Sequence, residues 1–233
     1  MSGSFNPEYI SSTLQILERR CLTLLSQGYC VTKSNGNISI DWEEEDISKE
    51  LLLSLNTNRK RLEWQIDIVP EHRLYKNDGI AAKSASRIDF RFSGWTANQW
   101  EYFAEAKNLI EVDSFKVGRK TKISATKLHK RYIETGIDNY VSGKYPSNGC
   151  LIGYILQGKI DNIISCLNDC LFNANRVSEI LKQQSLGLNE FDSCYVSIHD
   201  NSYSIKHLML DYTVKSDKTL SQAKSFLKGK SSL

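Results

Sequence analysis

The uninterrupted apolar run CLIGYIL, at residues 150–156, constrains the fold of this chain more than any other segment. A run of this length without alternating polar residues is typical of a β-strand that is buried on both faces. Helical patterns lie on either side of it in the sequence, at about 124–141 and about 160–184. Together these segments predict a mixed α/β fold.

The other segments give the expected order of elements along the chain. Apolar residues three and four positions apart indicate helices, and short runs bounded by turn residues indicate strands. The run at 62–69 is expected to end at Pro70. The full prediction is helices at 8–28 and 43–58, strands at 62–69, 87–92 and 100–107, a helix at 124–141, a strand at 150–156, a helix at 160–184, and a final hairpin of strands 194–198 and 203–210 that turns at Asp200-Asn201.

The composition is that of a folded protein without a membrane segment. Eleven Tyr, eight Phe and four Trp among 233 residues supply the aromatic surface that a disordered chain lacks. No stretch approaches the ~18–20 apolar residues that cross a bilayer, and the first residues lack the pattern of a signal peptide. The six Cys include no CxxC pair, which favours reduced thiols. We therefore expect one domain over residues 1–233, located in the cytoplasm and without a membrane partner.

The candidate site lies on the predicted hairpin of strands 87–92 and 100–107. Asp89 and Glu105 are equidistant from Ala97 at the centre of the turn, so we expect them to lie opposite one another on one face. Lys107 lies two residues beyond Glu105 and shares this face. The other face carries apolar side chains that we expect to be buried in a core: Ile88, Phe90, Phe92, Tyr102, Ala104 and Ala106.

The chemistry of the polar face depends on its two opposed carboxylates, which repel one another unless a cation lies between them. Mg²⁺ or Mn²⁺ takes oxygen ligands from carboxylates, waters and phosphates. The adjacent Lys107 would then stabilise charge at an attacking water or at the phosphoryl group. The alternative is a surface ladder of ion pairs, in which Asp89 and Glu105 pair with Lys107 and Arg91.

The Asp89…Glu105-Ala106-Lys107 arrangement resembles the PD-(D/E)xK nuclease superfamily, although Ile88 stands where a Pro often precedes the Asp. The resemblance implies a restriction endonuclease-like core, in which helices flank a mixed central sheet, over about residues 43–158. A C-terminal extension of a helix and a β-hairpin would occupy about 159–233. Its role stays open between extending the sheet, forming a dimer surface and docking a partner.

Members of that superfamily often use a further acid from the helix before the first strand. Glu44 falls within the buried arc of the predicted helix and is our first choice, with Glu50 second. The alternative for most of these acids is that they stabilise the N-terminus of the helix. The acidic cluster consists of Asp41, Glu43, Glu44, Glu45, Asp46 and Glu50.

A basic segment at 114–133 follows the hairpin and contains no acid. A charge run of this kind is often only a solvated face. Here it follows the proposed metal site, where a phosphate backbone would have to lie. Basic side chains that neutralise phosphates bind nucleic acid without sequence preference. The basic residues are Lys116, Arg119, Lys120, Lys122, Lys127, Lys130 and Arg131, of which Lys120, Lys122, Lys127, Lys130 and Arg131 are our expected contacts.

The resemblance implies a Mg²⁺- or Mn²⁺-dependent endonuclease that cuts phosphodiester bonds, with DNA rather than RNA as the expected substrate. Asp89, Glu105 and Glu44 would hold the metal, and Lys107 would position or activate water. Bacterial restriction or phage defence is the expected setting, with an ATPase or helicase partner and room for a homodimer. The alternative is a catalytically silent nucleic-acid-binding or scaffold subunit of a larger complex.

Two further patterns bear on other chemistries. The chain contains no GxxxxGK[ST] motif, so we do not expect it to hydrolyse ATP itself. His199 and His207 flank the last predicted hairpin without an evident nucleophile or carboxylate partner. This favours surface or packing roles for both.

Overall fold

The computed structural model describes residues 7–75, 85–94, 100–118, 120–188, 191–199 and 203–213. Four of the residues named above, Ala97, Arg119 and the turn residues Asp200 and Asn201, lie outside the described residues. In chain order the elements are α1 (Pro7–Asn35), α2 (Glu44–Asn56), α3 (Arg59–Glu63), β1 (Ile66–Leu74), β2 (Ser86–Gly94), β3 (Glu101–Ile110), β4 (Ser114–Phe115), β5 (Lys122–Ile123), α4 (Ala125–Arg131), the π-helix η2 (Tyr132–Ile137), α5 (Asp138–Val141), β6 (Gly149–Gln157), α6 (Ile160–Asn173), the 3-10 helix η3 (Val177–Glu179), β7 (Lys182–Gln183), β8 (Cys194–Ile198) and β9 (Ser204–Asp211).

A mixed seven-stranded sheet forms the centre of the fold, in the order β1-β2-β3-β6-β9-β8-β7. β6 runs parallel to both of its neighbours, β3 and β9, whereas the other pairs of the sheet are antiparallel. Every residue of β6 from Gly149 to Leu156 is buried. The apolar run therefore forms a strand buried on both faces, as predicted. The extension after residue 159 adds β9, β8 and β7 to the sheet.

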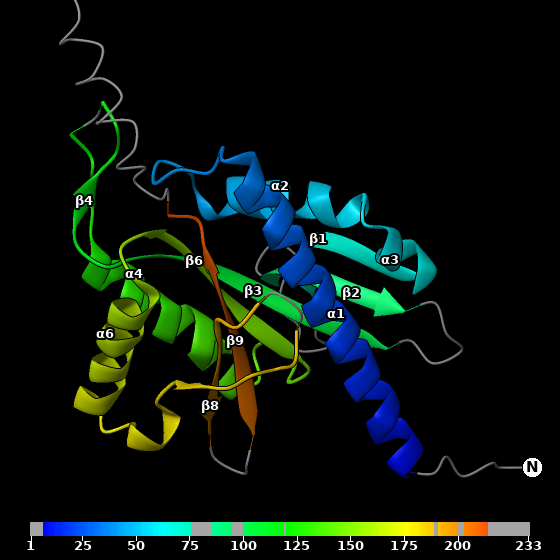
Figure 1. Ribbon diagram of the computed structural model, residues 1–233. Coiled ribbons are helices and arrows are strands. Elements are labelled where there is room, and N and C mark those ends of the chain that lie inside the picture. The colour runs from blue at the N-terminus through cyan, green and yellow to red at the C-terminus, as the bar shows by residue number, and fades with distance from the viewer. Residues whose placement is uncertain are drawn as a thin grey trace, which may run out of the picture.

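Helices cover both faces of this sheet, which makes the fold α/β. α1 runs diagonally across the sheet in Figure 1 and shares one core with α2, centred on residues such as Leu25, Leu51 and Phe92. η2 and α6 share the second core with the opposite face, through residues such as Tyr132 and Leu167.

Two long-range hydrogen bonds tie α1 to the end of β9. The Tyr29 hydroxyl donates to the Asp211 carbonyl at 2.9 Å, and the hydroxyls of Thr32 and Tyr212 lie 2.8 Å apart. The Lys33 ammonium adds an ion pair of 3.3 Å to the Asp211 carboxylate. Segments about 180 residues apart in the sequence are thus joined on one side of the sheet.

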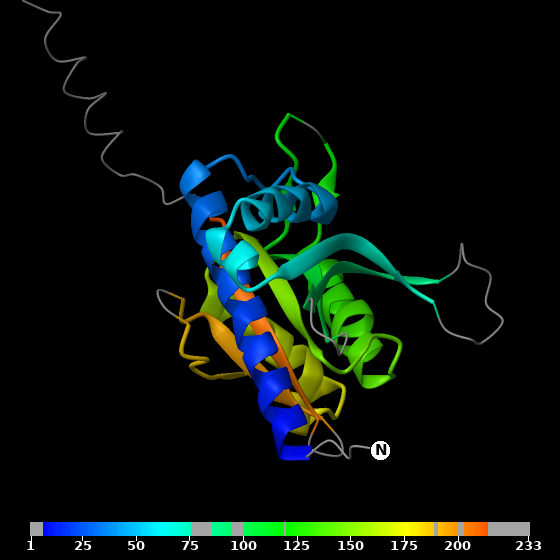
Figure 2. The same ribbon diagram turned by 90° about the vertical axis from the view of Figure 1, so that its right-hand side faces the viewer.

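The β2–β3 pairing confirms the predicted register but ends early. Phe90 pairs with Ala104, which centres the hairpin on position 97, and this is the last pair of the ladder. β2 continues its pairing with β1 to Ser86, and Figure 2 shows these two strands extending away from the rest of the fold. Ile88 consequently packs with Phe103 in the second core. The prediction that Ile88 and Phe90 share one apolar face was wrong, because the pairing of β2 with β3 ends at Phe90 and the two residues lie in different cores.

Four predicted boundaries were wrong. The first helix was expected over 8–28 but continues to Asn35. Pro70 does not end a strand, since it lies inside β1 opposite Phe90, and an edge strand tolerates the missing donor. Leu62 is helical in α3, so the strand begins only at Ile66. The helix expected to reach residue 184 ends at Asn173, close to the left-handed residue Asn175 (φ 58°).

The described residues also bear on the predictions about membrane segments and cysteines. Among the described helices, none is both long and apolar enough to cross a bilayer. All six cysteines are free thiols, and Cys21, Cys150 and Cys194 are buried.

Candidate active site

The centre of the candidate site is a buried acid–base pair on β3. Glu105 and Lys107 are each only 5% exposed and point toward the second core. β6 covers the strand on one side, pairing Leu151 with Glu105 and Gly153 with Lys107. The Lys107 ammonium contacts Glu105 Oε1 and donates to the Ala106 carbonyl at 3.0 Å. Because both side chains are buried, the predicted alternative of a surface ion-pair ladder does not describe this pair.

Asp89 reaches the same place from β2, at the point where β2 separates from β3. Its Oδ2 accepts a hydrogen bond of 2.7 Å from the Ala106 backbone N–H. Burial raises the pKa of Asp89 to about 7, and the negative charge of Glu105 adds to this shift, while Lys107 opposes it. Asp89 therefore holds a proton near neutral pH unless another cation stabilises its charge.

Two oxygen atoms beside this pair are buried without a hydrogen-bond partner among the described residues, Glu105 Oε2 and Asn108 Oδ1. Burial also raises the pKa of Glu105, against the lowering effects of Lys107 and of the nearby Tyr145 hydroxyl, which donates its hydrogen bond to the Arg87 carbonyl at 3.2 Å. A buried acceptor without a partner costs about 1–3 kcal/mol, so such atoms need an explanation in the function of the site. A bound cation or water would satisfy them.

Glu44 joins the cluster from the first turn of α2. Its Oε1 accepts from the Asn108 backbone N–H at 3.1 Å, and its Oε2 lies 2.9 Å from the Arg131 guanidinium and 3.9 Å from Lys107 Nζ. Glu50 makes no contact of this kind among the described residues. Asp89, Glu105, Lys107 and Glu44 are called the acid–lysine cluster below.

Part of the acidic segment, Glu43, Glu45 and Asp46, lies at the N-terminus of α2 as the alternative predicted. Glu43 caps α2, and Glu43 and Asp46 form a reciprocal capping box. Glu45 pairs with Arg87 at 3.1 Å on the surface. Glu44 is therefore the acid of this helix that turns toward β3.

The donor set of the cluster suits a hard divalent cation, because it consists of carboxylate oxygens. Within the described ranges, no three His, Cys, Asp or Glu side chains are close enough to form a complete metal-binding group. Asp89 and Glu105 supply the free acceptors, whereas Arg131 engages Glu44. The residues thus fit a cation held by two carboxylates and completed by water, with Glu44 close by.

The basic segment forms the small β4–β5 hairpin and the start of α4. This hairpin stands beside α2 in Figure 1, where the Val117 N–H donates to Asp41 at 2.7 Å. Three of the five expected phosphate contacts pair with acids: Lys122 with Asp113 (2.6 Å), Lys130 with Glu134 (3.4 Å) and Arg131 with Glu44. Lys120 and Lys127 are exposed and form no ion pair with a described residue.

A second buried polar cluster was not identified from the sequence. The Glu179 carboxylate lies 2.7 Å from His199 Nδ1, and Ser197 Oγ lies 2.8 Å from Nε2 of both His199 and His207. His207 Nδ1 is 2.9 Å from the Tyr132 hydroxyl. These five residues are called the His–Ser network below.

Part of the signal for this network was present in the sequence. Ser197 lies on β8 and His199 directly follows that strand, two residues further on, so the two-residue period places them on one face. The pairing of β8 with β9 brings His207 next to them. Of the two roles weighed for the histidines, the buried one applies, since His207 is fully buried and His199 is 5% exposed.

Comparison with protein-family models, curated proteins and solved structures found no match. The function must therefore be argued from the geometry of the site.

Proposed function

We propose that this chain is a metal-dependent nuclease that hydrolyses phosphodiester bonds, with a restriction endonuclease-like core and DNA as its expected substrate. The observation that carries the proposal is the free oxygen of Glu105, buried beside Asp89 and Lys107 where β2 separates from β3. Two buried carboxylates with raised pKa values, together with a buried lysine, are typical of a charged reaction centre.

Asp89 and Glu105 would hold Mg²⁺ or Mn²⁺, with Glu44 as a further carboxylate. The bound ion would neutralise phosphate charge and lower the pKa of water. Lys107 holds Glu105 in place and carries the proton donors that would orient the attacking water. Arg131 is half-exposed beside Glu44, so its guanidinium is placed to bind a phosphate oxygen of the substrate.

The exposed Lys120 and Lys127 would bind the phosphate backbone next to the cluster. A role in bacterial restriction or phage defence, an ATPase or helicase partner and a homodimer all belong to this proposal as its expected setting.

One observation favours a second candidate, a silent nucleic-acid-binding or scaffold subunit. Lys107 already satisfies one oxygen of Glu105 with its ammonium group, and Arg131 engages Glu44. A cluster neutralised in this way would hold the fold together without binding a metal.

A cleavage assay with the purified full chain tests both candidates. Plasmid, linear and single-stranded DNA and an RNA are incubated with Mg²⁺, with Mn²⁺ or with EDTA. We expect cleavage that depends on the divalent ion and is lost in Asp89→Asn and Glu105→Gln. Glu63→Gln is the matched control, because Glu63 is half-exposed and pairs with Arg59 on the same short helix, α3.

The outcomes separate the candidates. Cleavage that persists in EDTA, or in both site variants, would overturn the nuclease proposal. Nucleic-acid binding without cleavage in any metal would support the silent subunit.

A further inference from the structure

A pocket of about 660 Å³ lies at the end of β1, beside the start of β3 and the loop before β6. Four rings and one lysine are among the side chains that line it: His72, Tyr75, Trp100, Phe103 and Lys144. β1 and β2 extend away from the rest of the fold in Figure 2, and the β1 side of the pocket belongs to the far end of this pair. It is called the aromatic pocket below.

Two elements join the aromatic pocket to the acid–lysine cluster. Phe103 lies two residues before Glu105 on β3, so both side chains are on one face, about 7 Å apart along the strand. In the loop before β6, Tyr145 lies beside Glu105, and its neighbours Lys144 and Pro146 line the pocket. A strand that is bound at the cluster would therefore pass the pocket.

The rings give this pocket a surface for a flat ligand. Tyr75 is 68% exposed, and His72 and Trp100 are half-buried. Phe103 is buried, with its ring centre 6.3 Å from that of His72. Exposed aromatic side chains beside a cation are typical of proteins that bind single-stranded nucleic acid, because every base has a face that can stack.

The charges of the lining favour an anionic ligand. Lys144 is exposed and forms no ion pair with a described residue. Glu101 also lines the pocket, but Arg91 pairs with its carboxylate, which reduces its repulsion of an anion. The Asn148 side chain donates to the Glu101 carbonyl, which fixes the loop before β6 against β3.

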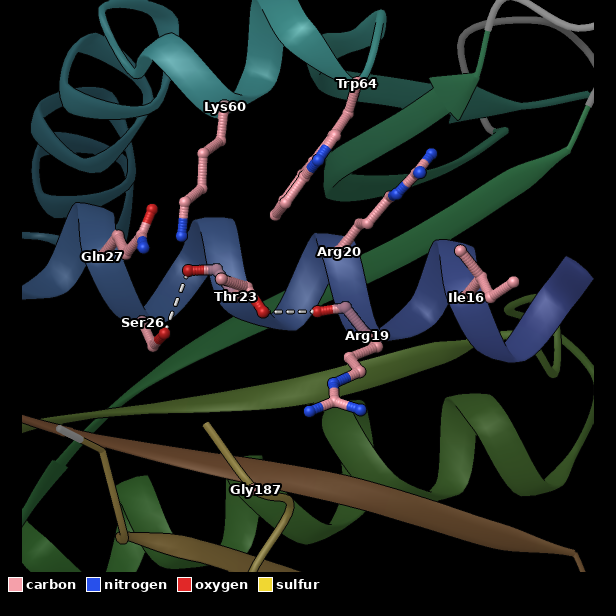
Figure 3. A pocket seen from close by; sticks show the side chains of 9 residues that line it. All are labelled: Ile16, Arg19, Arg20, Thr23, Ser26, Gln27, Lys60, Trp64 and Gly187. Atoms are coloured by element: carbon pink, nitrogen blue, oxygen red, sulfur yellow. Dashed lines mark hydrogen bonds between the residues drawn. The ribbon is translucent and has the colours of Figure 1, made fainter. Parts of the chain in front are cut away.

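The pocket of about 310 Å³ along α1, drawn in Figure 3, lacks this arrangement. Arg19 and Arg20 point to opposite sides of α1. Trp64 lies between Lys60 and Arg20, whose charged groups are 5.7 and 5.5 Å from the centre of its ring. These cations do not meet at one point, and neither face of the Trp64 ring is open to a base. In the aromatic pocket, by contrast, Tyr75 is largely open to solvent.

We propose that the aromatic pocket binds an unpaired base of the substrate strand, with the base against Tyr75 and Trp100 and a neighbouring phosphate on Lys144. The inference rests on the proposed function, because it takes the nucleic acid from there, and it names a strand with unpaired bases as the substrate. A paired base is held in the duplex by its partner and its stacked neighbours, so it has to leave the stack to enter a pocket. The volume is within the range of small-molecule sites, about 300–1,000 Å³.

Binding is measured by fluorescence anisotropy in EDTA on the Glu105→Gln protein, so that neither metal nor cleavage contributes. The probes are a single-stranded DNA oligonucleotide, an abasic strand with the same number of phosphates, and a duplex of the same sequence. We expect the single strand to bind about tenfold more tightly than either of the others, because stacking of a base on an aromatic side chain is favourable.

Variants in the same background then test the named residues. Tyr75→Leu and Trp100→Leu should each weaken binding of the single strand about tenfold and leave binding of the abasic strand unchanged. Lys144→Gln should weaken both strands alike and lower the slope of log affinity against log salt by about 0.7. Phe172→Leu is the matched control for the rings, since Phe172 is 62% exposed on α6 and does not line the pocket, and Lys182→Gln on β7 is the control for the lysine.

Three results would overturn the inference. The first is the absence of saturable binding to the single strand. The second is an abasic strand or a duplex that binds as tightly as the single strand. The third is an effect of Phe172→Leu as large as that of Tyr75→Leu. The Tyr75→Leu protein changes one exposed side chain, so it remains informative even if Trp100→Leu fails to fold.

The failure of this inference and the failure of the nuclease proposal are distinguishable, because cleavage is not measured here. A protein that prefers the single strand over the abasic strand but cuts no nucleic acid would contradict the nuclease proposal alone. A protein that cuts DNA but binds both strands equally would contradict the aromatic pocket alone.

Discussion

The acid–lysine cluster and the His–Ser network lie on the same face of the sheet and differ in whether their hydrogen bonds are complete. Glu105, Leu151 and His207 are partners in one row across β3, β6 and β9, so a single leucine separates the two clusters in that row. On one side of Leu151 a buried carboxylate oxygen has no partner among the described residues. On the other side every described ring nitrogen and hydroxyl of the network has one.

The His–Ser network can be assigned one consistent set of donors. Burial alone would raise the pKa of Glu179, but Arg176 and His199 lower it, so the carboxylate is ionised and accepts from His199 Nδ1. Ser197 then donates to His199, His207 donates to Ser197, and Tyr132 donates to His207. Burial lowers the pKa of His207 to about 3, which agrees with a neutral ring.

The comparison teaches how to separate structural from functional polar groups in a buried setting. A network that satisfies all of its donors and acceptors rigidifies the fold and offers nothing to a ligand. A cluster with mutual repulsion and a free acceptor is incomplete without one. The following predictions test this difference, from the largest expected effect to the smallest.

Glu105→Gln should abolish function while leaving the fold intact. Loss of the metal-holding charge removes several kcal/mol of transition-state stabilisation, which corresponds to about a thousandfold in cleavage rate. Rates are measured with Mg²⁺, and thermal unfolding is followed in parallel. A variant with unchanged cleavage would show that the incomplete cluster is not a reaction centre.

His207→Ala should do the opposite and destabilise the fold. The substitution removes the acceptor of the buried Tyr132 hydroxyl and one of the two partners of Ser197, and it creates a cavity. Together these changes cost about 3 kcal/mol. The free energy of unfolding in urea measures the effect, with the exposed Lys182→Ala on β7 as control. Unchanged stability would contradict the structural role of the network.

The two clusters should give opposite dependences of stability on pH. The pKa of Asp89 is raised to about 7 in the folded state, so its contribution is present below pH 4 and is lost as the pH rises toward 7. The pKa values of His199 and His207 are lowered by burial, so their effect destabilises the protein as the pH falls below about 6.5.

Unfolding in EDTA between pH 4 and pH 8 separates these contributions. In Asp89→Asn, stability should mainly rise with pH, because the contribution of the histidines remains. Added Mg²⁺ should give the parent protein a similar profile by stabilising ionised Asp89. Identical pH profiles for Asp89→Asn and the parent would refute the assignment.

The smallest effect is expected for a single exposed lysine of the basic segment. Lys127→Gln should weaken DNA binding a few-fold and lower the slope of log affinity against log salt by about 0.9 for duplex DNA. Titrations at several salt concentrations measure this slope, again with a substitution at Lys182 as the control. An equal change in both variants would place the DNA away from α4.

The sequence predicted the acid–lysine cluster well because strands and helices have fixed periods. The two-residue period placed Glu105 and Lys107 together, the symmetry of the hairpin placed Asp89 beside them, and the helical period selected Glu44 over Glu50. Glu44 does contact Asn108, Arg131 and Lys107. The separation of β2 from β3, which lies beside the free buried oxygen of Glu105, was not predicted because it depends on tertiary packing.

The His–Ser network and the aromatic pocket were missed for different reasons. Glu179 was assigned to a long helix, whereas α6 ends at Asn173 and the chain turns back to place Glu179 against His199. The strand that carries His72 was expected to end at Pro70, so the approach of His72 to Phe103 could not be inferred. Both errors come from segments whose conformation is set by distant contacts.

The attachment of α1 to Asp211 has a consequence for the order in which the protein assembles during synthesis. β6 is apolar on both faces and needs β9 along one edge, but β9 leaves the ribosome about 50 residues after β6. Until then the nascent chain carries an open apolar edge of the kind that promotes aggregation. The hydrogen bonds of Tyr29 and Thr32 also cannot form until Asp211 and Tyr212 have been translated. The sheet that carries the acid–lysine cluster would therefore be complete only after the β9 segment has been translated.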